Sequence, residues 1–455
     1  MTSSNARLGH VRRMSCGAAI AALTCLAAPS ALWGQTPPAA AVPAVKTTYV
    51  RLTGNANALL VEPAQAGPKS RIVVINVHPG KINVFEYFTG RALVARGYRM
   101  IGVNYYGPET TFEELLPPIG AAVKYARSIP GVERVVLVGH SGGGPELAYY
   151  ADIAENGPAA CQKPNRLYKC DPQGLTGLPK VDGVVIMEAN VGAPHRSFSI
   201  DPAVDTSNPK ARKPALDMYA PANGFDPKRN AGTYSAAFKA KYFTGQHERS
   251  QKLIAQAQAR LTAIDAHTGA YNDNEPFVVA GMAENSEGAR LNMADSSILA
   301  ETHGAHPHLR ADGTTPVEIA RSTRKAAATP AEDRDTLEET TQFTTVRHFL
   351  SYLATTTTAD YAMTKNDIKG VDWSSSANTV AGSLEGVTVP TLVMAGSCTI
   401  HMVPLKIGFD HAAAKDKEFV VVEGGDHSFR PCRPEFGDSA KKAFDYVDNW
   451  LNKRF

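Results

Sequence analysis

The chain has 455 residues, of which 43% are hydrophobic and 20% charged, so it is long enough for one large core with an insertion or for two domains. The formal net charge is +3, and the first 34 residues carry three arginines and no acidic residue, so the remainder is close to neutral. A neutral surface gives no electrostatic basis for binding nucleic acid or an anionic membrane, and we exclude both as partners.

The N-terminal segment 1–34 has the pattern of an export signal. Its arginines precede an uncharged, largely apolar run over 14–32, and small residues and prolines follow. A cleaved signal of this kind predicts export to the periplasm or the medium, with no integral membrane span in the mature chain. The pattern leaves the signal type and the cleavage site open.

Residues 35–192 are expected to form the first part of an α/β core. Short β-branched runs predict buried strands, and the longer stretches between them predict helices. The expected strands are 47–52, 58–61, 71–77, 98–104, 135–138 and 181–187, and the expected helices are 85–96, 112–128 and 145–155. This alternation predicts the α/β class, with a mostly parallel sheet and right-handed crossovers.

The alternation stops near residue 193 and resumes near residue 386. We expect 193–385 to be a mainly helical or irregular insertion between two late strands, with helices over 234–264 and 341–355 and polar turns over 266–335. The second part of the core is then 386–455. It is expected to hold strands over 390–395 and 418–423 and a final helix over 439–452.

The segment Gly139-His140-Ser141-Gly142-Gly143 fits the pattern G-x-S-x-G. The motif alone is weak, but it lies between a predicted buried strand and a predicted helix. A strand, a tight glycine turn and a helix are what a nucleophile elbow requires, because this turn holds the serine at the end of the strand beside the helix N-terminus. The context predicts that Ser141 is a nucleophile.

Four cysteines lie beyond the export segment, at 161, 170, 398 and 432. An even number in an exported chain indicates disulfides, for which three pairings are possible. No metal site is expected, because the sequence has no C-x-x-C pair and the histidines at 303, 306 and 308 lie in a polar loop.

At this point the sequence resembles the serine esterases and lipase-like members of the α/β-hydrolase fold. The resemblance is carried, in chain order, by the opening hairpin, VVINVHPG, LVGHSGGG, VTVPTLVMAG and VVEGGDHSF. It implies a hydrolase without a cofactor, in which the insertion forms a cap or lid over the active site. The insertion itself matches no pattern of the family.

The resemblance implies a triad in the chain order serine, acid, histidine, with His427 as the base. The usual place for the acid is the loop 397–404, which here has no carboxylate. A minority of the family places the acid one strand earlier, where Glu188 follows VVIM, so Glu188 is preferred over Asp410 and Asp426. A Glu188 oxygen is then expected at about 2.6–3.2 Å from His427 Nδ1.

The oxyanion hole is also assigned from the resemblance. Gly142 is expected to donate one backbone N–H, and the loop after the strand 71–77 the other, from Lys81 or Gly80, since Pro79 has none. Tyr105 and Tyr106 follow the next strand at the active-site edge, where they would either line the substrate pocket or cap the sheet. His78 is expected to brace its loop, and His140 to shape the elbow.

The convergence of the loops after the late strands, implied by the resemblance, favours pairing Cys398 with Cys432 and therefore Cys161 with Cys170. The first disulfide would fix the histidine loop where the usual acid is missing, and the second would be structural.

The sequence thus predicts an exported serine hydrolase that cleaves small-molecule carboxylic esters through an acyl-enzyme. An amidase or a C–C (diketone) hydrolase would use the same residues, and a non-catalytic binding protein on this fold is the alternative from another class. The size of the acyl and alcohol groups, the oligomeric state and the role of the cap stay open.

Overall fold

A computed structural model describes residues 44–53, 56–78, 83–84, 87–104, 111–205, 208, 211–271, 273–283 and 288–455. The expected export segment, both candidates for the second oxyanion donor (Gly80 and Lys81) and the expected pocket residues Tyr105 and Tyr106 lie outside these ranges. The chain from Pro43 to Phe455 forms one compact unit, which contains both parts of the predicted core and the insertion.

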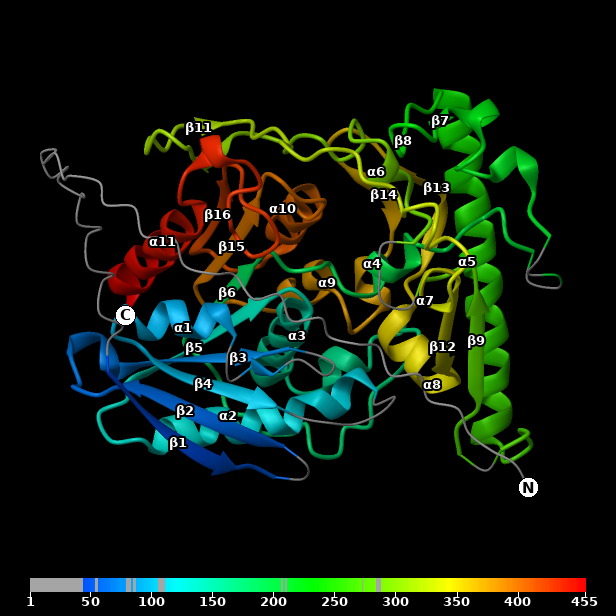
Figure 1. Cartoon of the computed structure of the whole chain (residues 1–455). Helices are drawn as coiled ribbons and strands as arrows, with labels where there is room; N and C mark the ends of the chain where they lie inside the picture. Colours follow the sequence, from blue (N-terminus) through cyan, green and yellow to red (C-terminus); the bar gives the residue numbers. More distant parts are fainter. Residues whose placement is uncertain are drawn as a thin grey trace, which may run out of the picture. The chain divides into compact units, whose positions relative to one another are not determined.

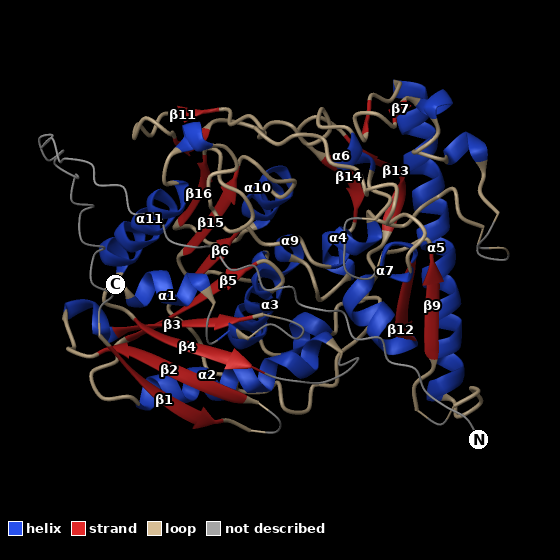
Figure 2. Cartoon of the chain, viewed as in Figure 1, coloured by secondary structure: helices blue, strands red, loops and turns tan. Residues whose placement is uncertain are grey.

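A sheet of ten strands, counted in the described ranges, organises this unit (Figures 1 and 2). In spatial order these are β1 (Val45–Arg51), β2 (Asn57–Pro63), β4 (Arg99–Asn104), β3 (Ile72–Val77), β5 (Arg134–His140), β6 (Gly183–Met187), β15 (Thr391–Gly396), β16 (Lys417–Val422), β10 (His306–Leu309) and β11 (Val317–Glu318). The strands from β4 to β10 pair in parallel, and antiparallel pairs close both edges. This is the mostly parallel α/β sheet that the sequence predicts.

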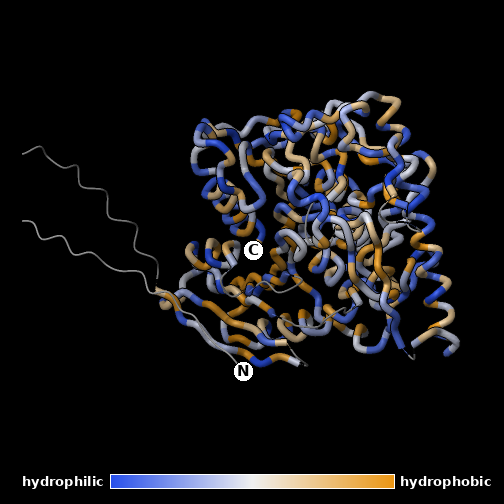
Figure 3. Tube along the Cα trace, turned by 45° about the vertical axis from the view of Figure 1, so that its right-hand side comes forward, coloured by the Kyte–Doolittle hydropathy of each residue, from blue (hydrophilic) through white to orange (hydrophobic). Residues whose placement is uncertain are grey.

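Helices cover both faces of the sheet. On one face lie α1 (Phe88–Val94) and α11 (Ser439–Arg454); on the other lie α2 (Leu116–Ser128), α3 (Gly143–Asn156), α9 (Val380–Leu384) and α10 (Met402–His411). The inner strands consist mainly of Val, Ile, Leu and Met because both of their faces are buried. In β5, for example, Val135 and Leu137 face one core and Val136 and Val138 face the other. Figure 3 shows hydrophobic segments of the chain, in orange, alternating with hydrophilic segments, in blue.

The insertion has a core of its own. Its longest element is α5 (Ala236–Asp265), which begins at the capping residue Ser235. Leu253 and Ile254 of this helix are buried with Phe277 and Phe349. Beside it lie two antiparallel strand pairs: β9 (Pro276–Ala280) with β12 (Thr341–Thr345), which are distant in the chain, and the hairpin of β13 (Thr357–Met363) and β14 (Ile368–Val371).

Shorter elements complete the described part of the chain. The helical ones are η1 (Pro68–Arg71), η3 (Phe112–Leu115), η4 (Pro158–Cys161), α4 (Ala193–Ser197), η5 (Pro214–Leu216), η6 (Pro221–Asn223), α6 (Leu291–Ala294), α7 (Leu337–Thr340), α8 (Val346–His348), η7 (Phe349–Leu353), η8 (Trp373–Ser375) and η9 (Pro434–Phe436). The remaining strands are β7 (Phe225–Asp226) and β8 (Ala231–Gly232).

Part of the insertion joins the main sheet. β10 pairs in parallel with β16, with His308 opposite Val421 and Leu309 opposite Val422. The sequence places this segment among polar turns, because a strand of four residues leaves almost no periodicity to detect. The insertion therefore extends the sheet beside the strand that leads to His427.

The helix predicted over 341–355 is wrong. Its first residues form β12, in which Gln342 and Thr344 are buried while Phe343 between them is exposed. This alternation with a period of two fits a strand, and pairing with β9 satisfies its backbone. Helical structure begins only at Val346 and continues as a π-helical segment from Phe349 to Leu353.

None of the helices in the described ranges combines the length and the apolar character that crossing a bilayer requires.

Candidate active site

Ser141 occupies the turn between β5 and α3. Its φ is +55°, in the left-handed region that side chains other than glycine seldom adopt. The turn needs glycine two residues after the serine, because a Cβ on Gly143 would lie 2.1 Å from the carbonyl oxygen of Val77 in β3. The serine is therefore held in a strained, fixed conformation at the carboxyl end of the central strand, as a nucleophile elbow requires.

His427 faces Ser141 from the loop that follows β16. Its Nε2 lies 2.9 Å from Ser141 Oγ, so the serine hydroxyl can donate its proton to this nitrogen. The imidazole is partly open, with 44% of the side chain exposed. The structure thus brings the predicted nucleophile and the predicted base into contact.

Glu188 lies directly behind this histidine. It follows β6 with a φ of +41° and is fully buried. Its Oε2 is 3.5 Å from His427 Nδ1, which is longer than the 2.6–3.2 Å expected from the sequence. The same oxygen accepts a closer contact, 3.1 Å, from Nδ1 of His401.

Two further donors hold the other oxygen of this carboxylate. Glu188 Oε1 accepts the backbone N–H of Gly396 at 2.5 Å and the hydroxyl of Thr399 at 3.1 Å. Burial acts to raise the pKa of Glu188, but the contacts with the imidazoles of His401 and His427 outweigh it and lower the pKa to about 2. The carboxylate is therefore ionised at neutral pH.

The two other acids considered from the sequence lie elsewhere. Asp410 is in α10 and pairs with Lys406 one turn earlier. Asp426 accepts the backbone N–H groups of Ser428 and Arg430 and shapes the turn beside His427, instead of facing its ring. Of the three candidates, Glu188 is the one whose carboxylate faces the imidazole of His427.

His140 braces the site from the other side. Its Nε2 donates to the backbone carbonyl of His427 at 2.5 Å, and its Nδ1 accepts the hydroxyl of Tyr87 at 2.6 Å. A carbonyl can only accept, so these bonds fix the neutral tautomer with the proton on Nε2. Burial is the main cause that lowers the pKa of His140 to about 3.

Gly142 is the one expected oxyanion donor that lies within the described ranges. This buried residue precedes the first helical residue of α3, where backbone N–H groups have no partner within the helix. Its N–H is therefore available beside Ser141. The ring of His78, in the loop of the expected second donor, packs 5.6 Å from that of Tyr87.

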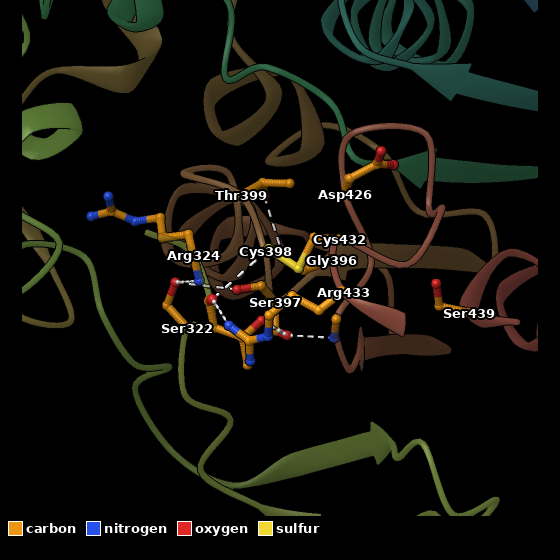
Figure 4. Close-up of a disulfide and its surroundings, with 12 residues drawn as sticks. Ser322, Arg324, Gly396, Ser397, Cys398, Thr399, Asp426, Cys432, Arg433 and Ser439 are labelled. Atoms are coloured by element: carbon orange, nitrogen blue, oxygen red, sulfur yellow. Dashed lines mark hydrogen bonds between the residues drawn. A yellow bond between two sulfur atoms is a disulfide. The ribbon is translucent and has the colours of Figure 1, made fainter. Parts of the chain in front are cut away.

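Both predicted disulfides are present. Cys161 bonds Cys170 beside α3, and Cys398 bonds Cys432 beside the site. Figure 4 shows the second bridge joining the loop after β15 to the loop that carries His427. The backbone N–H of Cys398 also donates to Gly425 at 3.0 Å, so the two loops are connected covalently and by hydrogen bonds.

A segment of the insertion packs against the same bridge (Figure 4). The hydroxyl of Ser322 donates to the carbonyl of Ser397 at 3.1 Å, and Arg433 donates to the carbonyl of Thr323 at 3.3 Å. The insertion therefore contacts the loops that hold the acid and the base.

Three residues of the site were not identified from the sequence: His401, Thr399 and Tyr87. His401 and Thr399 lie in the loop where the family's acid was sought, so a search for carboxylates passed over them. The signal was present, since a hydroxyl and an imidazole two residues apart are suited to receiving a carboxylate from another strand.

Glu188, His401 and His427 are also the group within the described ranges that could hold a metal ion, since their ligand atoms all lie within 4.8 Å of one another. Both Nδ1 atoms face one carboxylate oxygen, at 3.1 and 3.5 Å. Imidazole N–H groups directed at a carboxylate account for this arrangement without a metal. The histidines at 303, 306 and 308 do not converge: His308 pairs with Glu318, and the ring of His306 packs on Phe419.

No protein-family model matches the chain, and no curated protein is similar to it in sequence. A hypothetical protein of Pseudomonas aeruginosa has a similar solved structure, with 13% identity, coverage of 93% of this chain and 97% of that one, and a TM-score of 0.43. The esterase domain of a Rhodothermus marinus protein has 13% identity, with coverage of 90% of this chain and 98% of that one and a TM-score of 0.35. A soluble variant of the monoglyceride lipase of Saccharomyces cerevisiae has 12% identity, with coverage of 91% of this chain and 96% of that one and a TM-score of 0.38.

These likenesses are too distant to carry an argument about the activity or the fold of this chain. Its parallel sheet is covered by helices on both faces, and a serine lies in the tight turn after the central strand β5. The histidine follows β16, two strands beyond β6 in the sheet. The chain therefore has the α/β-hydrolase type of fold that its motifs resemble.

Proposed function

We propose that this protein is a serine hydrolase that cleaves small-molecule carboxylic esters through an acyl-enzyme. The observation that carries the proposal is the 2.9 Å contact between Ser141 Oγ and His427 Nε2. A serine hydroxyl is a weak nucleophile at neutral pH, and a histidine at this distance activates it by accepting its proton.

In the proposed acylation step, Ser141 Oγ attacks the ester carbonyl carbon while its proton passes to His427 Nε2. The carbonyl oxygen becomes an oxyanion, which accepts the N–H of Gly142 and a second N–H from the loop of Gly80 and Lys81. When the intermediate collapses, the C–O bond to the alcohol breaks. His427 gives its proton to the leaving alkoxide, and the acyl group stays on Ser141.

The deacylation step repeats this chemistry with water. His427 takes a proton from water, the resulting hydroxide attacks the acyl carbon, and the bond to Ser141 Oγ breaks as His427 returns the proton to the serine. Glu188 stays ionised throughout and stabilises the imidazolium that forms twice in each cycle. No cofactor enters the cycle.

Export is part of the proposal. The signal-like segment 1–34 motivates it, and the two disulfides support it, because structural disulfides persist mainly in oxidising compartments. Amide or C–C bond cleavage would use the same residues, so the choice of an ester is tested with substrates.

A fluorophosphonate probe and a panel of p-nitrophenyl esters test the proposal. The purified protein should be labelled on Ser141 and should release p-nitrophenol, whereas S141A should do neither. A protein that binds small esters but is not labelled and releases no product would be a non-catalytic binder on this fold.

A further inference from the structure

We propose that His401 is a positioning residue of this site: it shares the carboxylate of Glu188 with His427 and keeps that carboxylate oriented during turnover. The inference rests on the proposed function, because a positioning role needs a reaction to serve. It deepens that function by assigning a role to a second histidine, which does not touch the reacting atoms.

The geometry at Oε2 of Glu188 is the first support. His401 Nδ1 lies 3.1 Å from this oxygen and forms a hydrogen bond, whereas His427 Nδ1 lies 3.5 Å away and does not satisfy hydrogen-bond geometry. The two rings are 5.0 Å apart. The closer and better-formed contact of the acid is therefore with His401, not with the base.

Burial divides the two histidines into different roles. The side chain of His401 is 10% exposed and that of Glu188 is fully buried, whereas 44% of the His427 side chain is exposed. His427 must exchange protons with Ser141 and with the leaving group, so its contact with the acid changes during each cycle. His401 is enclosed and provides a contact that does not change.

The tautomer of His401 is consistent with this role. Its Nε2 is buried and has no hydrogen-bond partner among the described residues. A proton there would be a buried donor without an acceptor, which costs about 1–3 kcal/mol. That tautomer would also turn the lone pair of Nδ1 toward the carboxylate oxygen, whereas the neutral form with the proton on Nδ1 directs its one N–H at Glu188.

The loop after β15 explains why the acid can come from β6. This loop supplies three donors to Glu188: the backbone N–H of Gly396, the hydroxyl of Thr399 and Nδ1 of His401. A buried carboxylate is costly unless it is hydrogen-bonded, so a glutamate at this position needs such a set of donors. The loop after β15 has no carboxylate of its own and instead provides the hydrogen-bond donors for the carboxylate of Glu188, which follows the neighbouring strand β6.

The test removes the Nδ1 donor and then restores it. H401L deletes the N–H, and H401N keeps an amide N–H near the position of Nδ1. We expect kcat for a p-nitrophenyl ester to fall roughly tenfold in H401L with KM unchanged, and H401N to keep kcat within about threefold of the parent. A role limited to packing would instead favour the bulkier apolar Leu over Asn.

A double-mutant comparison tests whether His401 acts through Glu188. In an E188Q background, H401L should lower kcat by less than about twofold, because the charge that His401 orients is already gone. H308L is the matched control: His308 is also buried and contacts a carboxylate, Glu318, through Nδ1 at 2.7 Å, but it lies in β10. It should leave kcat unchanged.

Each outcome decides the inference. Full activity of H401L, with S141A inactive, overturns the role of His401 and leaves the proposed function standing; full activity of S141A overturns the function itself. Equal losses from H401L in the parent and in the E188Q background show that His401 acts by another route. Activity that EDTA removes and Zn²⁺ restores, in the parent but not in H401N, shows a metal site instead.

If H401L does not fold, H401Q replaces it as the variant without the donor, because the amide of Gln lies near the Nε2 position and not near Nδ1.

Discussion

His140 Nε2 donates a hydrogen bond of 2.5 Å to the backbone carbonyl of His427. The residue that precedes the nucleophile thereby holds the main chain of the base, so the elbow and the histidine loop are fixed against each other. Nε2 can donate this bond in either protonation state, but only the neutral ring has an Nδ1 lone pair that accepts the Tyr87 hydroxyl, and burial disfavours the charged ring. The Tyr87 contact and the burial of His140 therefore link the site to pH.

We expect His140 to make the protein sensitive to acid. Its folded-state pKa is about 3, below the ordinary 6.5, so the unfolded chain gains a proton on this ring first as the pH falls. The stability that the neutral ring provides is therefore complete above pH 6.5 and is lost as the pH falls toward 3. Between pH 6.5 and 4.5 the loss should be roughly 2 kcal/mol.

Denaturant unfolding at several pH values measures this effect. H140N should lose less stability than the parent between pH 6.5 and 4.5, whatever its stability at pH 7. Glu188 acts at lower pH, since its pKa of about 2 in the fold means that its contribution is lost only below about 4.5. H267N is the control, because His267 is exposed and its φ of +55° suits asparagine. Equal pH dependence in the parent, H140N and H267N would contradict the prediction.

Replacing the nucleophile should abolish turnover. S141A removes Oγ and should lower kcat by about 10⁴-fold or more. The variant should remain folded, because Ala removes only one oxygen atom. Ala keeps the Cβ of serine, so the backbone strain at a φ of +55° does not increase. Ester hydrolysis and circular dichroism measure the two quantities, and near-normal hydrolysis by a folded S141A would end the serine-hydrolase proposal.

Replacing the acid should cost less than replacing the nucleophile. E188Q keeps the shape of the side chain but removes the charge that stabilises the imidazolium. Its amide NH₂ can also face an imidazole N–H, and two donors cannot form a hydrogen bond with each other. We expect kcat to fall by roughly 10²- to 10⁴-fold. Asp410 and Asp426 contact other groups, so D410N and D426N should each change kcat by less than about threefold. A larger loss in either Asp variant than in E188Q would show that the acid was misassigned.

The two disulfides should differ in their effect on catalysis. Cys398–Cys432 joins the loop that holds Glu188 to the loop of His427, whereas Cys161–Cys170 closes a loop beside α3. The double variant C398A/C432A should lower both kcat and the unfolding temperature, because the acid and the base are no longer tied together. C161A/C170A should lower mainly the unfolding temperature, since a disulfide contributes about 2–4 kcal/mol to stability.

Non-reducing peptide mapping gives an independent check of the cysteines. Peptides should show the two pairs of the structure and no free thiol in protein recovered from an oxidising compartment. If C161A/C170A loses as much kcat as C398A/C432A, the loss reflects general destabilisation and the second bridge has no special link to catalysis.

Much of the architecture follows from local sequence. The β-branched runs that become β3, β5 and β6 are buried on both faces, so they leave largely apolar segments, broken in β3 by Asn76, that are recognisable without a structure. The elbow is recognisable because only glycine fits beside β3 at position 143. The loop of His427 was recognisable from its resemblance to the family's histidine loop.

The sequence alone determined the α/β class, the elbow of Ser141, the placing of His427 and a short list of possible acids. Only the tertiary structure decided that β10 joins the sheet, that β12 is a strand and that Glu188 lies between two histidines. The reason is physical: each of these depends on segments far apart in the chain, such as β12 with β9 or Glu188 with His401. A hydrogen bond between such distant segments leaves no pattern in the sequence of either one. It can form only after folding has brought the two segments together, so only the structure reveals it.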